Sequence, residues 1–249
     1  ICMSNCPEIV YIIGAASILG AKINIFSDEF DKDYITQIIN GCKCNIAFIE
    51  DNKYNSLKES LSKTHLKNVI VSSLAKSLPK NCILEKSIDK DHLDLFLDKT
   101  YEISKTDNKC IPIDIFEKES KKYSGTMKDY FHYGNLNEEF SITYSSGSTN
   151  SSRPKAIVHN VRRFITMGRY HDKEVSGATS MKNFVVEAII PTHSNTDIIC
   201  GISDSLMQGS KLALEPIYDK DFLIESLNFY GTNYVTATTS FWVNLAKQI

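Results

Sequence analysis

The chain has 249 residues, of which 42% are hydrophobic and 23% are charged, so it can bury a sizeable core as a soluble globular protein. Its formal net charge is −2, from 28 basic and 30 acidic residues, and no block of lysines and arginines is dense enough to follow a nucleic-acid backbone. We therefore expect no nucleic-acid partner.

The cysteines indicate a reducing compartment. There are seven, an odd number scattered along the chain, which is unlike the dense disulfide framework of a small secreted domain. Cys42 lies beside Cys44, and Cys2 lies four residues from Cys6, but no second pair stands at a zinc-site distance. We expect free thiols, a cytoplasmic location and no metal site.

The longest uncharged apolar stretch argues against a membrane span. It covers residues 9–21, which is shorter than the roughly 20 residues that cross a bilayer. Glu8 stands where an export signal carries basic residues, so no export signal is evident. The first residue is Ile rather than Met, and we therefore expect upstream sequence to be missing.

The first third of the chain alternates between helical and extended patterns. Apolar spacing predicts helices over 9–19, 30–39 and 56–66, with Gly41 as a left-handed terminator of the second. Strands are predicted over 21–26, 46–49 and 69–71. Such alternation is typical of an α/β fold in which helices cover both faces of a mostly parallel sheet.

The pattern weakens over 72–133, which we interpret as a connecting region with one or two helices, and then resumes at Phe140. We predict a strand that enters a polar turn, further strands over 156–159, 185–190, 211–214 and 234–237, and helices over 160–170, 196–207, 220–229 and from 240 onward. The chain is thus predicted to form two α/β subdomains, residues 1–133 and 134–249, the second carrying the turn.

That turn, residues 145–155, reads SSGSTNSSRPK and combines six hydroxyl side chains with one glycine and two cations. Hydroxyls and turn-exposed N–H groups donate to phosphate oxygens, Gly147 lets the backbone approach closely, and Lys155 or Arg153 adds positive charge. Such a loop suits a polyphosphate. A solvated turn rich in Ser and Asn is the alternative interpretation.

A resemblance adds to this interpretation. Ser145-Ser146-Gly147-Ser148-Thr149 followed by Pro154-Lys155 is similar to the phosphate loop of the adenylate-forming superfamily, written (T/S)SG(S/T)TGxPK(G/A). Asn150 stands where the family has a Gly after the Thr. Four residues separate Thr149 from Pro154, whereas the family has two at this place. Further along, Pro191-Thr192-His193 and then Gly209-Ser210-Lys211 resemble the family's aromatic/His motif and the strand after its next helix.

The resemblance implies the site as well as the fold. It identifies the chain as a partial N-terminal domain like that of acyl-CoA synthetases, with layered, mostly parallel sheets flanked by helices. It implies that ATP contacts a set of loop residues: Ser145, Ser146, Gly147, Ser148, Thr149 and Lys155. It places His193 beside the acyl pocket, and it puts the family's magnesium-binding Glu and lid Lys beyond Ile249.

The implied activity is ATP-dependent activation of a carboxylic acid to an acyl-adenylate, with Mg²⁺, followed by transfer to a thiol such as CoA. We expect this fragment alone to be inactive. Two alternatives stay open: an adenylation module of peptide assembly, whose acceptor is a carrier-protein thiol, and a degenerate homologue that acts as a binding or scaffold domain. The sequence does not select the acid.

Overall fold

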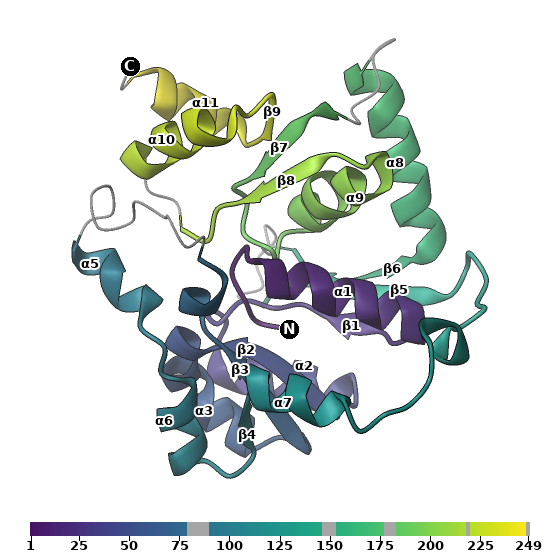
Figure 1. The fold of residues 1–249 in the computed structure, drawn as a ribbon, viewed down its shortest axis with the longest axis vertical. Coiled ribbons are helices and arrows are strands. Elements are labelled where there is room, and N and C mark those ends of the chain that lie inside the picture. The colour runs from purple at the N-terminus through teal and green to yellow at the C-terminus, as the bar shows by residue number, and fades with distance from the viewer. Residues whose placement is uncertain (79–89, 146–152, 177–182, 218–219, 248–249) are drawn as a thin grey trace.

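The computed structural model describes residues 1–78, 90–145, 153–176, 183–217 and 220–247 (Figure 1). These ranges form a mixed α/β structure with three sheets of three strands each. The strands are β1 (Ile23–Asn24), β2 (Ile46–Glu50), β3 (Asn68–Ser72), β4 (Cys110–Pro112), β5 (Glu139–Tyr144), β6 (Ala156–Asn160), β7 (Val185–Ala188), β8 (Lys211–Leu214) and β9 (Tyr234–Thr236). The α-helices are α1 (Pro7–Leu19), α2 (Lys32–Gly41), α3 (Tyr54–Ser62), α5 (Lys90–Leu93), α6 (Thr100–Thr106), α7 (Ile113–Ser120), α8 (Val161–Ser176), α9 (Asp204–Gln208), α10 (Lys220–Tyr230) and α11 (Thr239–Ala246).

The first parallel sheet has the order β2-β3-β4 and is covered on both faces. On one face, a set of apolar side chains from the sheet packs against α2, α3 and α6; it includes Ile49 and Val71 from the strands and Ile39, Leu57 and Ile103 from the helices. On the other face, Phe48 meets Phe116 of α7 edge to face at 5.9 Å. This confirms the prediction of a mostly parallel sheet flanked by helices.

The second parallel sheet has the order β8-β7-β9 and lies at the other end of the molecule in Figure 1. Helix α1 lies between the two parallel sheets in that view. A second core forms where α1 packs against late segments of the chain: Ile9 and Ile13 cluster with Phe164, Ile198 and Ile202. Residues close to the N-terminus are therefore buried by residues from the second half of the chain.

The remaining sheet has the order β1-β5-β6 and contains a β-hairpin. Strand β1 runs parallel to β5, and β5 runs antiparallel to β6, with Tyr144 opposite Ala156 at the loop end of the hairpin. The predicted phosphate loop therefore connects two paired strands. Because β1 pairs with β5, hydrogen bonds cross the proposed division at residue 133, and the two-subdomain division stays a prediction.

Two local predictions are wrong. Gly41 is the last residue of α2, and the left-handed residue is Lys43, with φ of 52°, whose N–H donates to the carbonyl of Asn40. Residues 72–133 are more than a connection, because they contribute β4, the third strand of the first sheet. Strand β4 is only three residues long and ends at Pro112, so its sequence carries almost no extended signal.

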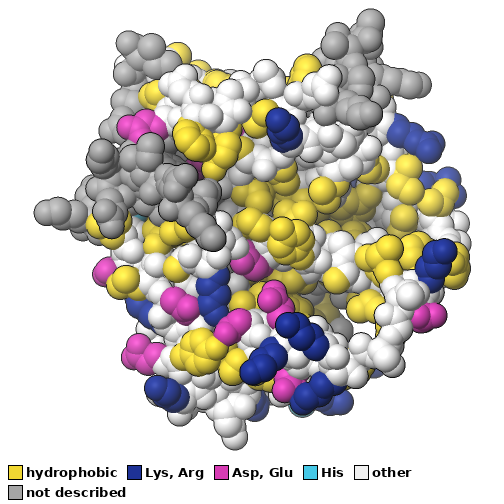
Figure 2. Space-filling model, viewed as in Figure 1, with side chains coloured by type: hydrophobic (Ala, Val, Ile, Leu, Met, Phe, Trp, Pro, Cys, Tyr) yellow, Lys and Arg dark blue, Asp and Glu magenta, His cyan; other side chains and the backbone are white. Residues whose placement is uncertain are grey.

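Figure 2 shows that lysine and arginine side chains on the displayed face are interspersed with acidic ones, while hydrophobic side chains gather across its middle. Helix α1 contributes to the exposed apolar surface, since Tyr11 is 72% and Leu19 is 57% exposed. Among the helices in the described ranges, none is both long enough and apolar enough to cross a membrane.

Candidate active site

The two ends of the predicted phosphate loop meet at the end of the β5–β6 hairpin. The N–H of Ser145 donates to the carbonyl of Lys155 at 3.0 Å, and the N–H of Lys155 lies 3.4 Å from Ser145 Oγ. The structure thus brings the first and last predicted site residues together. Ser146, Gly147, Ser148 and Thr149 lie outside the described residues, so their contacts with phosphate stay predictions.

Helix α2 holds the C-terminal end of this loop. The Tyr34 hydroxyl donates to the carbonyl of Pro154 at 2.5 Å, and Arg153 Nη1 donates to Gln37 Oε1 at 3.3 Å. Tyr34 and Gln37 lie one helical turn apart, so the same face of α2 makes both contacts. A helix from the first third of the chain therefore contacts the two residues directly before Lys155.

An aromatic cluster connects the base of the loop to His193. Tyr144, the last residue of β5, lies edge to face with Phe30 at 5.7 Å and with Tyr34 at 6.1 Å between ring centroids. Phe30 in turn meets the His193 ring edge to face at 6.4 Å. The Tyr144 hydroxyl is anchored by donating to Asn24 Oδ1 at 2.8 Å. Two sites that the sequence singled out separately are thus joined through one phenylalanine.

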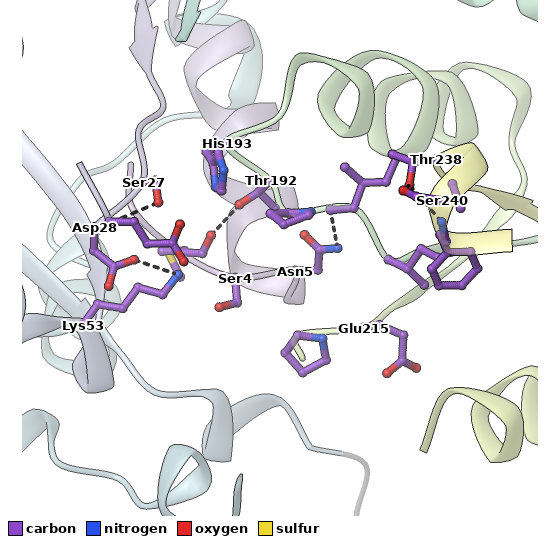
Figure 3. A pocket seen from close by; sticks show the side chains of 18 of the residues that line it. Ser4, Asn5, Ser27, Asp28, Lys53, Thr192, His193, Glu215, Thr238 and Ser240 are labelled. Atoms are coloured by element: carbon purple, nitrogen blue, oxygen red, sulfur yellow. Dashed lines mark hydrogen bonds and ion pairs between the residues drawn. The ribbon is translucent and has the colours of Figure 1, made fainter. Parts of the chain in front are cut away.

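His193 lines a pocket of about 440 Å³ (Figure 3). In that view, Asp28 and Lys53 lie on one side of the pocket and Glu215 lies on the other, with His193 between them. Lys53 Nζ and Asp28 Oδ1 are 3.7 Å apart, a loose ion pair on the pocket wall. The pocket is large enough for a small organic acid and has a charged side beside the histidine.

The environment of His193 keeps its ring neutral at physiological pH. Burial, and then the positive charge of Lys53, lower the pKa of His193 below the ordinary value of 6.5, while the nearby Glu29 and Asp28 oppose that shift. A neutral imidazole can accept a hydrogen bond at one nitrogen and donate one at the other. The neutral ring can therefore orient an uncharged or negatively charged group by a hydrogen bond, without an ion pair to an imidazolium.

Two side-chain contacts fix the segment that carries His193. The buried Thr192 hydroxyl donates to the carbonyl of Met3, and Asn5 Nδ2 donates to the carbonyls of Ala188 at 2.8 Å and Ile190 at 3.0 Å. The N-terminal segment therefore braces the end of β7 and the turn that follows it.

Several polar residues of this pocket were missed in the sequence. Asp28 and Lys53 follow β1 and β2, in short polar connections that look like ordinary surface turns. Glu187, which does not line the pocket, was also missed although its signal is clearer: it stands within the apolar sequence VVEAII and is only 1% exposed in the structure. A carboxylate within a buried strand indicates a specific environment rather than a solvent-facing one.

Comparisons with known proteins agree with this architecture. A family model for AMP-binding enzymes matches residues 1–249. No curated protein matches the chain.

Several solved structures share the fold. A red-emitting luciferase from Phrixothrix hirtus superposes with a TM-score of 0.72 at 16% identity, covering 99% of this chain and 52% of the luciferase. The o-succinylbenzoate CoA synthetase of Bacillus subtilis, solved with an acyl-adenylate intermediate, gives 0.61 at 12% identity, with 99% and 50% coverage. Coronafacic acid ligase from Pectobacterium brasiliense gives 0.66 at 15% identity, with 99% and 41% coverage. The chain thus spans about half or less of these proteins.

Proposed function

This chain belongs to the family of AMP-binding enzymes, and on that premise we propose that it is part of an ATP-dependent ligase that activates a carboxylic acid as an acyl-adenylate. The acid's oxygen would form a bond to the α-phosphorus of ATP while the bond to the pyrophosphate oxygen breaks. A thiol such as CoA would then form the thioester and release AMP. The single observation that supports this most is the aromatic connection between the phosphate-loop stem and His193.

Each element has a distinct task in this proposal. The hydroxyl and N–H groups of the loop, with Lys155, would hold the polyphosphate and stabilise the leaving pyrophosphate by hydrogen bonds already in position. The neutral His193 would orient the carboxylate at the pocket. Phe30 would hold the phosphate loop and His193 in a fixed relative position, because it packs against both Tyr144 and His193.

Mg²⁺ would supply charge neutralisation on the phosphates when it is bound. Among the residues that the structure describes, no group of three His, Cys, Asp or Glu side chains could hold a metal ion. We therefore assign no Mg²⁺ ligand and no metal-dependent step to these residues.

The test separates the two halves of the proposed site. A crystal soaked with an ATP analogue is expected to hold its phosphates at the loop between Ser145 and Lys155. Lys155→Met should weaken nucleotide binding by about fivefold or more, since it removes a charge-assisted contact. His193→Ala should leave nucleotide affinity unchanged, which makes it the matched control. An analogue bound away from the loop, or a Lys155→Met variant with unchanged affinity, would contradict the proposal.

One alternative has a specific observation in its favour. Asn150 and the two extra residues before Pro154 depart from the family's loop, which favours a homologue that binds nucleotide without using it. ATP–pyrophosphate exchange by the longer protein that contains this chain would exclude that alternative. We expect the chain by itself to bind nucleotide weakly and not to catalyse exchange. Determining which thiol accepts the acyl group distinguishes the two enzymatic alternatives. CoA would indicate a CoA ligase, and a carrier-protein thiol would indicate an adenylation module of peptide assembly.

A further inference from the structure

Two carboxyl groups from different elements meet at one serine hydroxyl beside the His193 pocket. Ser226 Oγ of α10 lies 2.6 Å from Oε1 of Glu187, in the middle of β7, and it also contacts Oε1 of Glu215, which comes directly after β8. The two carboxyl groups are hydrogen-bonded to each other as well. Glu187 is 1% and Glu215 is 6% exposed, so this cluster lies in the interior of the protein.

The hydrogens available to this cluster require that one carboxyl group is protonated. A hydroxyl has one hydrogen, so Ser226 can donate to only one of its two neighbours, and two carboxylates have no hydrogen for a bond between them. Thr232 donates to Oε2 of Glu187, which favours Glu187 as the anion and Glu215 as the neutral acid. Burial first, and then the hydrogen bond and charge of Glu187, raise the pKa of Glu215 to about 8, although Ser226 opposes the shift.

The protonation of Glu215 decides the charge of one wall of the His193 pocket. Glu215 lines that pocket, on the side opposite Asp28 and Lys53 (Figure 3), whereas Glu187 does not line it. With its proton, the Glu215 side of the pocket is neutral, and without it the same side carries a negative charge. The charge acts on a ligand through several ångströms of protein of low dielectric constant, so the ligand needs no contact with the buried carboxyl oxygens.

The other charged groups around the pocket leave the range near pH 8 to the carboxyl pair. Burial, and then the charge of Lys53, lower the pKa of His193 below 6.5, so its ring is already neutral there. Burial lowers the pKa of Lys53, but its acidic neighbours raise it further, to above 10.5, so its ammonium stays charged. Asp28 and Glu29 are the remaining acidic side chains in the described lining. Among the described residues, the charged group that acts on Glu215 itself is Glu187.

We propose that the proton held between Glu187 and Glu215 is a switch that sets which ligands the His193 pocket accepts. While the pair keeps the proton, the wall at Glu215 is neutral and the pocket admits the carboxylate of an acid. When the proton is released to solvent in alkaline medium, the additional negative charge repels that carboxylate. This assignment rests on the proposed function, because it takes the His193 pocket as the acid-binding site, and it adds a pH-dependent control of that site.

The first experiment observes the proton on the full chain without any ligand. The infrared C=O stretch of a protonated carboxyl group is separate from the bands of carboxylates. We expect such a band at neutral pH that disappears as the pH rises through about 8. Glu215→Gln should lack this pH-dependent band, whereas Glu102→Gln, at an exposed carboxyl group of α6, is the matched control and should keep it. A native chain without the band, or a Glu215→Gln variant that retains it, would overturn the switch.

The second experiment measures how ligand binding depends on pH. Binding of benzoate, and of benzamide as its uncharged counterpart of the same shape, is measured by calorimetry on either side of pH 8. The affinity for benzoate is expected to fall about tenfold as the pH rises, because a nearby negative charge repels the carboxylate, while the affinity for benzamide stays constant. In Glu215→Gln, which is neutral at every pH, benzoate should bind equally well throughout. Circular dichroism establishes that each variant is folded.

A benzoate affinity that falls as steeply in Glu215→Gln as in the native chain would overturn the switch. Equal pH dependence for benzoate and benzamide would overturn it too, since charge would then not be the cause. Absence of benzoate binding at every pH would contradict the link between the carboxyl pair and the pocket. These results are distinguishable from failure of the proposed function, because nucleotide binding at the loop is measured separately. An ATP analogue that binds there while benzoate affinity ignores pH leaves the adenylating function standing.

Discussion

The central strands of the two parallel sheets, β3 and β7, have equivalent positions but bury different side chains. In β3, Val69 and Val71 are at most 2% exposed and pack in an apolar cluster with the covering helices. In β7, the equally buried Glu187 stands between Val186 and Ala188 and is held by hydroxyl groups. The middle of β3 is therefore apolar, whereas the middle of β7 holds a carboxylate; in the first sheet the buried carboxylate, Glu50, stands at the end of β2.

The largest change in the free energy of unfolding is expected from placing a carboxylate in the middle of β3, where β7 has Glu187. Val71→Asp places a carboxyl between Ile49 and Pro112, within an apolar cluster that offers little to replace its hydrating water. We expect a loss of roughly 4 kcal/mol or more in the free energy of unfolding, measured in urea. A loss below about 1 kcal/mol would mean that the two sheets tolerate buried charge alike.

The converse change replaces the carboxylate in the middle of β7 by an apolar side chain. It is expected to lower the free energy of unfolding by a smaller amount. Glu187→Leu removes the acceptor used by Thr232 and one of the two acceptors used by Ser226, which keeps its contact with Glu215. The unpaired Thr232 hydroxyl should cost about 2 kcal/mol, even though the variant no longer buries the Glu187 carboxyl. Glu187→Gln, which retains one acceptor oxygen, is the control and should lose less. A Leu variant as stable as the native chain would show that the polar core of β7 contributes nothing to folding.

The comparison also predicts how the stability of the chain depends on pH through Glu215. Because the pKa of Glu215 is about 8 in the folded chain against an ordinary 4.5, the folded state retains a proton that the unfolded state has released. The stability from this group is fully present below pH 4.5 and is lost as the pH rises through 8. Urea titrations across that window should show a shallower decline in Glu215→Gln than in the native chain. Identical slopes would place the proton elsewhere.

The same comparison explains what the sequence could and could not predict. Apolar runs such as 46–49 and 69–71 predict buried parallel strands. Helices cover both faces of such a sheet, so its strands contain few polar residues. Strand β8 was predicted with its observed bounds, Lys211–Leu214. Strand β4 was not, because three residues ending in proline gain their extended form from pairing with β3 rather than from their own pattern.

The candidate site divides in the same way. The phosphate loop and His193 stand out because residue type and order carry the signal. Asn5, Lys53 and Glu215 do not, because each acquires its place from elements distant in the sequence. Asn5, for example, bonds the carbonyls of Ala188 and Ile190, and nothing in residues 1–10 announces that partnership. Glu187 was also missed, although a carboxylate within the apolar residues 185–190 is a signal that the sequence contains.

The long-range bracing by Asn5 has a consequence for how the chain is assembled during synthesis. Residues 1–6 and α1 leave the ribosome before the rest of this chain, yet the carbonyls that Asn5 caps and several side chains that cover Ile9 come from residues 164–202. The sheet β2-β3-β4 can form from residues 46–112. Helix α1 must therefore wait, with an uncovered apolar face, while its neighbours are still being translated. Nascent chains that stall before residue 164 should be the ones that chaperones retain.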